Sequence, residues 1–412
     1  METLSHQDVV NLFLQLAAML LLARVFAELA RKVNQPSVVG EILAGILMGP
    51  TILGNFLPEI HTYLFDSNVN SNLALDGFVQ ISVVLLLFIA GLEVELNVVW
   101  SQGKNAFRIA VFSMLIPIIC GFILAYSFPE FLGLNIEEPF VASLFFGLSI
   151  SITALAVVAR VLMDLNVFKT HSGLLIIASA MIVDILAWIV FSIILSVSDT
   201  GQQGLGVFWT IFLTLGFTFF MLTIGKGVIG KTLPWINKNL AWPGGLLSLA
   251  LATCFLAASF TEFIGIHAIF GAFIIGVALG DSEHLSERAK EILHQFINNI
   301  FAPIFFVSIG LKVNFVEGFD PVIVGVVVVV GLLAKVAGGY YGSRLSGFPK
   351  WKAKLIGFGL NTRGSVDIIL GLIALENGLI QEPMFIGLVI LALISAISSG
   401  PLMKWAIQEN HP

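Results

Sequence analysis

Asp184 stands about halfway along an apolar run, LLIIASAMIVDILAWIVF, that is long enough to belong to a membrane-spanning helix. A charged side chain at the centre of a bilayer costs about 2.5–3.5 kcal/mol on insertion scales. The carboxylate is therefore expected to pair with another group, to bind a metal cation, or to take up a proton. Exchange of H⁺ for a metal cation on this one side chain is the chemistry that its position favours. A structural aspartate bonded to neighbouring helices is the alternative.

Two further apolar runs are interrupted near their middles by polar residues. The first carries Ser149, Ser151 and Thr153, and the second carries Asn361, Thr362, Arg363, Gly364 and Ser365. Such runs suit unwound backbone that lines a cavity, where half-helix ends offer carbonyl groups to a cation and amide groups to an anion. For the first run taken alone, hydroxyl bonds to the preceding helical turn are favoured. Taking both runs together, we predict an ion-binding set of Asp184, Ser149, Ser151, Thr153, Asn361, Thr362 and Ser365.

Three other ionisable residues lie deep in apolar runs and are predicted to support this site. Lys335, within VGLLAKVAGG, is either a structural counter-ion or a competitor for the binding carboxylate. Arg363 and Asp367 are four residues apart, a spacing that permits a local ion pair on a helix. We therefore expect Asp367 to stabilise Arg363 and not to bind the transported ion. Glutamates near predicted helix ends are expected to be rim charges: Glu41, Glu93, Glu95 and Glu262.

The elements that must hold these residues are membrane helices. Hydrophobic residues make up 58% of the 412-residue chain and charged residues only 11%, against roughly 25% in soluble domains. The apolar runs are long and lack the period-two alternation of strands, so the fold class is all-α. We predict a single transmembrane transporter domain over residues 1–412 with thirteen spans. They cover 8–31, 37–54, 76–96, 105–127, 139–163, 172–196, 206–229, 243–264, 267–281, 296–313, 321–344, 352–376 and 383–406.

Positive charge is distributed unevenly between the predicted loops. Most of the 20 Lys and Arg residues lie in alternate loops or at adjoining helix ends, with Lys312 as an exception. By the positive-inside rule, the N-terminus is outside and the C-terminus cytoplasmic, in a multi-pass protein of the cell membrane. Glu2 and Asp8 precede the first apolar run, whereas a cleaved signal peptide begins with basic residues, so we expect that run to remain as a helix.

Three pairs of segments recur in the same order along the chain. GEILAGILMG at 40–49 resembles GAFIIGVALG at 271–280, FIAGLEVEL at 88–96 resembles VSIGLKVNF at 307–315, and FGLSISIT at 146–153 resembles FGLNTRGS at 358–365. The pattern predicts two six-helix repeats over about 8–196 and 243–406, with the span at 206–229 as linker. Matched spans cross the membrane in opposite directions, so the repeats are inverted, which is a transporter architecture.

Sequence signals of other function classes are absent. There is no P-loop, no GxGxxG after a strand, no nucleophile elbow and no HExxH. We expect no enzymatic activity, no cofactor, no nucleic-acid partner and no nucleotide-binding domain in this chain. Cys120 and Cys254 lie in apolar runs, so we interpret them as packing residues. We predict that the charged segment Ser282–His294 is a surface linker.

The motifs VVGEILAGILMGPTILG, LLLFIAGLEVEL, GAFIIGVALGDS, PIFFVSIGLKVNF and NTRGSVDIILG resemble the monovalent cation:proton antiporter superfamily. The branch is the Kef-type and NapA-like one of the sodium/hydrogen exchangers, and the resemblance covers about residues 8–406. It implies an NhaA-like antiporter fold with crossed, broken helices, a dimerisation domain and a mobile core domain. It also implies that Asp184 is the ion-binding aspartate and that Lys335 is the lysine of the core.

One position departs from the electrogenic members of that superfamily, which carry two adjacent aspartates. This chain has Val183 before Asp184. We therefore expect electroneutral exchange of Na⁺ or K⁺ for H⁺ by alternating access, with Asp184 binding the cation and the proton in turn, in a homodimer. A gated K⁺ channel or uniporter, and a carrier of an anion or organic solute, are the alternatives.

Overall fold

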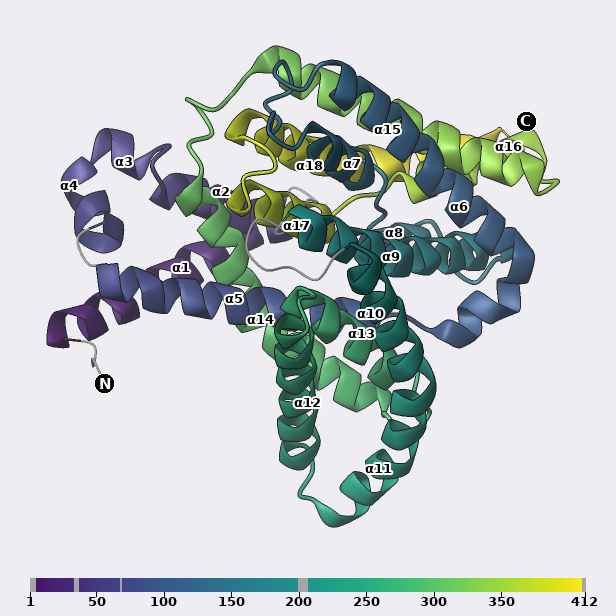
Figure 1. Ribbon diagram of the computed structural model, residues 1–412, viewed down its shortest axis with the longest axis horizontal. Coiled ribbons are helices and arrows are strands. Elements are labelled where there is room, and N and C mark those ends of the chain that lie inside the picture. Colours follow the sequence, from purple (N-terminus) through teal and green to yellow (C-terminus); the bar gives the residue numbers. More distant parts are fainter. Residues whose placement is uncertain (1–4, 33–36, 67–68, 199–206, 410–412) are drawn as a thin grey trace. The chain divides into compact units, whose positions relative to one another are not determined.

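The computed structural model describes residues 5–32, 37–66, 69–198 and 207–409, and in these ranges its regular elements are helices (Figure 1). One isolated bridge joins Leu134 to Ile380. Ten helices of the described ranges are long and apolar enough to cross a membrane. The predicted all-α membrane architecture is therefore confirmed, because the apolar runs satisfy their backbone hydrogen bonds within single helices. The shorter helix α13 (Ala268–Gly280) and two interrupted helices, over residues 139–164 and 350–376, would each add one crossing and give thirteen spans. That count stays a prediction.

Contacts along the chain group its residues into two compact units. The first comprises residues 1–92, 224–260 and 271–319, and the second comprises 93–223, 261–270 and 320–412. Each unit combines segments from both halves of the sequence. The predicted single transporter domain, with repeats over 8–196 and 243–406, stays a prediction.

The first unit contains two groups of helices. Its N-terminal group is α1 (His6–Lys32), α2 (Ser37–Met48), α3 (Leu53–Phe56), α4 (Pro58–His61), the π-helical turn η1 (Thr62–Asp66) and α5 (Val69–Leu92). Its second group is α11 (Lys226–Asn239), most of α12 (Gly244–Phe263) and of α13 (Ala268–Gly280), and α14 (Glu287–Lys312).

The second unit carries the residues of the predicted site. It contains α6 (Leu96–Ser127), α7 (Pro139–Ser149), α8 (Leu155–Asp164), α9 (His171–Ser198), α10 (Val207–Phe220), α15 (Pro321–Leu345), α16 (Lys350–Leu360), α17 (Ser365–Glu376) and α18 (Glu382–Gln408). The π-helical turn η2 (Met221–Gly225) leads from α10 to α11.

Glycines at matched positions of the predicted repeats make matched contacts in the first unit. A Cβ on Gly45 of α2 would lie 2.2 Å from the Val307 carbonyl oxygen of α14. A Cβ on Gly276 of α13 would lie 2.3 Å from the Phe88 carbonyl oxygen of α5. The motif pairs align Gly45 with Gly276, and they align α5 with α14. Helix α2 therefore packs on α14, while α13, the counterpart of α2, packs on α5, the counterpart of α14. These matched contacts favour an internal repeat.

Four boundary predictions were wrong. Helix α5 begins at Val69 instead of 76, and α6 begins at Leu96 instead of 105. Helix α14 begins at Glu287 instead of 296, so only the first part of Ser282–His294 is a linker. The early start follows from Ser286, whose side chain caps the helix by accepting from Ala289 N at 3.2 Å. The helix predicted to end at 229 continues through η2 and α11 to Asn239. This continuation contains Gly227, Gly230 and Pro234, which are poor helix formers, so its helical conformation does not follow from local propensity.

Candidate ion-binding site

Two interrupted helices meet in the second unit. Helix α7 ends at Ser149 and α8 begins at Leu155, while α16 ends at Leu360 and α17 begins at Ser365. The predicted breaks at both polar runs are confirmed. Thr153 Oγ1 donates to Leu360 O at 2.7 Å, and Ala154 N donates to Thr362 O at 2.8 Å. The unwound backbone of each break therefore supplies hydrogen-bond partners to the other.

Arg363 holds the crossing together from the second break. Its guanidinium donates to Asp367 Oδ1 at 3.1 Å, to Ser149 O at 2.9 Å, and to Ile150 O. Arg363 is 1% exposed, and the Asp367 carboxylate also accepts from Gly364 N at 3.0 Å. The predicted i,i+4 pair is confirmed. Asp367 is fully engaged as a partner of Arg363 and as a cap of α17, so it is not an open ligand.

Lys335 reaches the same end of α7 from α15. Its ammonium group donates to Ser151 O and, at 3.2 Å, to Ser113 O of α6, and the residue is 0% exposed. Arg363 and Lys335 together place two cations at the C-terminal end of α7. Cations are favourable there because the last carbonyl groups of a helix carry partial negative charge. In this arrangement Lys335 is bound to backbone carbonyl groups and forms no ion pair with Asp184.

Asp184 lies in α9, which packs against α7, α8 and α16. It is 5% exposed, and its Oδ1 is buried without a hydrogen-bond partner among the described residues. It lies close enough to Lys335, Asp367 and Glu93 to interact with their charges. The Oδ1 of Asn361 and the Oγ1 of Thr362 are also buried without a partner in the described ranges. Three oxygen atoms on α9 and the second break thus lack a partner.

The predicted serines play a different part from Asn361 and Thr362. Ser149 Oγ donates to Phe146 O at 2.9 Å and Ser151 Oγ donates to Leu148 O at 2.7 Å. These are the hydroxyl bonds to the preceding helical turn that the sequence favours for the first polar run taken alone. The backbone carbonyl groups of both serines accept the buried cations instead. The Ser365 side chain lies outside what the structure describes.

Sequence reasoning missed two residues. Ser113 was one Ser in an apolar run, yet its carbonyl group holds Lys335 and its Oγ is buried without a partner among the described residues. Glu41 was expected at a rim, but it is 6% exposed, which corrects that prediction. Glycines on both sides of Glu41 let α2 pack closely on α1 and on α14, which buries a side chain near a helix end. The glycines of the motif GEILAGILMG were the sequence signal that could have indicated this burial.

Comparison with known proteins decides the family. The model of the transmembrane sodium/hydrogen exchanger family matches residues 17–408. The chain belongs to the sodium/hydrogen exchanger family. The predicted membership of the cation:proton antiporters is thereby confirmed.

Curated members of this exchanger family differ in length. The chain is 31% identical to the Na⁺/H⁺ antiporter NhaS4 of Synechocystis over 93% of each chain. It is 27% identical to the Na⁺/H⁺-K⁺ antiporter GerN of Bacillus cereus, over 95% of each chain. It is 30% identical to cation/H⁺ antiporter 17 of Arabidopsis thaliana over 95% of its own length, but it spans only 48% of that relative.

A solved structure shows the same fold. The sodium proton antiporter MjNhaP1 of Methanocaldococcus jannaschii superposes with a TM-score of 0.66 at 19% identity, covering 97% of both chains. The predicted antiporter fold class is confirmed.

Proposed function

We propose that this exchanger is a secondary active antiporter that moves a monovalent cation, Na⁺ or K⁺, against H⁺. The carrying observation is the buried, open carboxylate of Asp184 beside two crossed helix breaks. The names of NhaS4 and GerN support the substrates, and the fold shared with MjNhaP1 supports the mechanism class. By this activity the protein would contribute to pH and cation homeostasis.

In this proposal Asp184 binds the cation and the proton in turn. Asn361 Oδ1 and Thr362 Oγ1 are the neutral oxygens that would join it around a cation, because both lack a partner among the described residues. Thr153, Ser149, Ser151 and Ser365 belong to the breaks that shape the site. Alternating access would expose Asp184 to one side of the bilayer and then to the other. A homodimer in the cell membrane is part of the same proposal.

The two rival functions are less well supported by the charges. An anion carrier needs a free buried cation, but Arg363 and Lys335 are held by Asp367 and by carbonyl groups. A K⁺ channel or uniporter needs no exchangeable carboxylate. The test is a ΔpH assay in proteoliposomes with Na⁺, K⁺, Li⁺ and choline in turn. We expect Na⁺ or K⁺ to drive H⁺ movement and choline to drive none, whereas a channel would show no coupled H⁺ movement.

Exchange is expected to be electroneutral. If Lys335 stays charged through the cycle, Asp184 alone exchanges its load, and binding one H⁺ or one monovalent cation leaves the same net charge. Loss of the Lys335 proton when the cation binds would instead make the exchange electrogenic. Val183 stands where a second aspartate would be, and Asp367 is paired with Arg363. Current on a solid-supported membrane after a Na⁺ or K⁺ jump measures this balance. A sustained transport current that disappears in Asp184→Asn would show instead that more than one H⁺ moves per cation.

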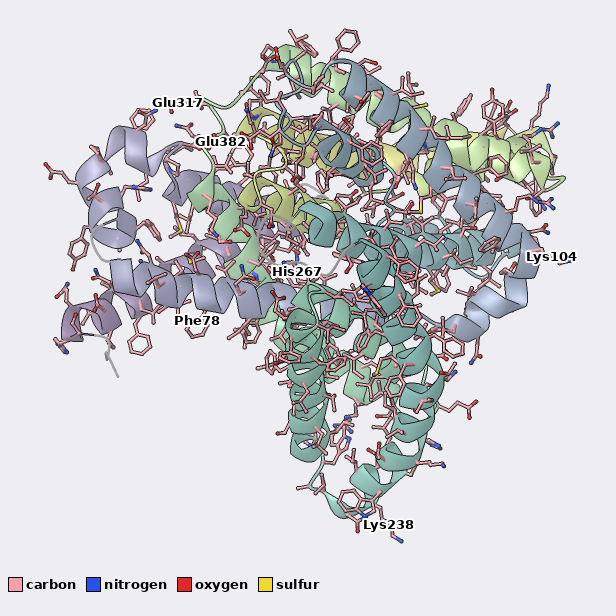
Figure 2. All side chains as sticks on the ribbon, in the orientation of Figure 1. Phe78, Lys104, Lys238, His267, Glu317 and Glu382 are labelled. Atoms are coloured by element: carbon pink, nitrogen blue, oxygen red, sulfur yellow. The ribbon has the colours of Figure 1, made fainter. Side chains whose placement is uncertain are left out.

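We propose that the N-terminus is outside and the C-terminus cytoplasmic, because the positive-inside rule favours this direction. Lys104 lies in α6 beside the kink at Gly103, Lys238 lies in the last turn of α11, and Glu317 lies in a turn after α14; all three are exposed (Figure 2). In a background with Cys120→Ala and Cys254→Ala, we expect Glu317→Cys to react with an impermeant maleimide added to intact cells. Cysteines at Lys104, Lys238 and Lys352 should react only after permeabilisation. The reverse pattern would invert the topology.

A further inference from the structure

Helix α16 leads directly into the site residues Asn361 and Thr362. It ends at Leu360, whose carbonyl group accepts from Thr153 Oγ1 at 2.7 Å. The side-chain oxygens of Asn361 and Thr362, which are buried without a partner in the described ranges, follow in the unwound segment. The position of α16 therefore decides where these oxygens lie relative to Asp184, and the contacts that hold α16 bear on cation binding.

Two neighbours hold α16 through close apolar packing. A Cβ on Gly339 of α15 would lie 2.8 Å from the Cα of Gly357, so these two helices meet backbone to backbone. A Cβ on Gly359 would lie 3.0 Å from Ile176 Cδ1 of α9. Glycine surfaces are smooth and apolar attraction is non-directional, so such contacts restrict movement of α16 along its own axis less than a hydrogen bond does.

The third neighbour, α18, adds directional contacts from its C-terminal end. Lys354 of α16 donates to both carboxylate oxygens of Glu409 at 2.7 Å, and its ammonium group lies 4.7 Å from the centroid of the Trp405 ring. The Trp405 ring also packs on Phe358, with ring centroids 6.0 Å apart. Phe358 lies one turn after Lys354 and two residues before Leu360, so α18 contacts the last turn of α16 before the break.

Helix α18 is suited to act as a support. It packs against α15 and α17 as well as α16, and a Cβ on its Gly400 would lie 3.7 Å from Val161 of α8. Lys354 is bound at once to a carboxylate and to a ring face of this helix, and its side chain is 29% exposed. Lys352 lies instead 5.4 Å from the centroid of the Trp351 ring, and that contact stays within α16.

We infer that Lys354, Trp405 and Glu409 form a clamp between α16 and α18 that positions the two neutral oxygens of the cation site. The inference rests on the proposed function, because it concerns the cation that Asp184 binds. The three residues are positioning residues. Without the clamp, α16 shifts along its axis and carries the neutral oxygens away from Asp184. Cation affinity then falls, whereas Asp184, which belongs to α9, still takes up H⁺.

The dependence of the exchange rate on cation concentration tests the clamp. Lys354→Met keeps the apolar stem but removes the charge, so we expect the KM for Na⁺ or K⁺ to rise about two- to fivefold, the range that a half-exposed ion pair supports. The maximal rate should stay within a factor of about two, because the loss is one of binding. Lys354→Arg retains a cation for the carboxylate and the ring, and should keep a KM close to that of the wild type.

Lys350→Met is the matched control, because Lys350 is an exposed lysine one turn earlier on the same helix. It should have the wild-type KM. An unchanged KM in Lys354→Met, an equal rise in Lys350→Met, or a fall in the maximal rate alone would overturn the clamp.

The tryptophan of the clamp is tested by a double variant. Trp405→Ala removes both ring contacts and should also raise the KM, whereas Trp235→Ala, at a tryptophan of similar exposure in the first unit, should not. Because Lys354 and Trp405 act on the same helix as one unit, the KM of the double variant should rise by less than the product of the two single effects. A fully multiplicative rise would contradict a shared clamp.

Cation binding can also be measured without transport. A cation that binds the folded protein raises its melting temperature. The Na⁺ or K⁺ concentration that gives half of this rise should increase in Lys354→Met by the same factor as the KM, and should not change in Lys350→Met. Equal concentrations in Lys354→Met and the wild type would overturn the clamp even where antiport is confirmed. A wild type without coupled H⁺ movement would refute antiport, and these concentrations would still decide the clamp.

Discussion

Replacing Asp184 by Asn is expected to reduce cation-driven H⁺ movement to the level of empty vesicles. The substitution keeps the size of the side chain but removes its negative charge and its proton-binding oxygen. Asp184 makes no hydrogen bond or ion pair with a described residue, so the variant breaks no structural contact of that kind. The loss should therefore appear in the ΔpH assay, while thermal unfolding in detergent and the size-exclusion profile stay close to those of the wild type.

Asp76→Asn is the matched control for this loss. Asp76 is a half-exposed carboxylate in the first unit that pairs with Lys312 at 3.2 Å. The control makes the same chemical change at a solvent-accessible ion pair, which contributes little to stability. It should exchange cations at nearly the wild-type rate. Wild-type exchange by Asp184→Asn would remove Asp184 from the mechanism.

Arg363→Met is expected to be the most destabilising of these changes. It deletes the donors to Asp367 Oδ1, Ser149 O and Ile150 O, and it leaves the Asp367 carboxylate buried without its cation. Breaking one partner of a buried ion pair costs about 3–5 kcal/mol, because the remaining charge stays out of water. The melting temperature of the purified protein should fall clearly, and the crossing of the two breaks should lose its rigidity.

A double variant separates the unpaired charge from the lost packing. Arg363→Met with Asp367→Asn removes the orphaned charge, while the Asn side-chain oxygen can still accept from Gly364 N as the cap of α17. We expect its melting temperature to lie between those of the single variant and the wild type. Arg108→Met is the control, because Arg108 is exposed and donates to a single carbonyl group, Leu345 O. If Arg363→Met melts like the wild type, the guanidinium does not hold the crossing.

Both predictions follow from how four buried ionisable side chains of the second unit are paired: Asp184, Lys335, Arg363 and Asp367. Asp367 pairs with Arg363, and the side chains of Arg363 and Lys335 donate to carbonyl groups at the end of α7. Asp184 is left as the carboxylate without a fixed partner. If Lys335 stays charged, this arrangement lets Asp184 alone exchange its load, which is the condition for the proposed one-for-one exchange.

Residue type and spacing predicted the helical class, the two breaks and the Arg363–Asp367 pair. These features are local: long apolar runs favour helices, mid-span polar runs favour unwound backbone, and four residues make one helical turn. Helix ends were less predictable. The start of α14 lies in a charged segment, because capping by Ser286 acts independently of hydropathy.

The sequence by itself determined which charges lie in the membrane and which segments are interrupted there, because both depend on single runs of residues. Only the tertiary structure decided which of those charges are paired. Lys335 and Arg363 come from different helices to the end of α7, and no spacing along the chain reveals that meeting. The same holds for Glu41, whose burial depends on close packing of α2 against two helices that are distant from each other in the sequence. Burial and pairing are properties of contacts between segments, and they settle which carboxylates remain open to a proton or a cation.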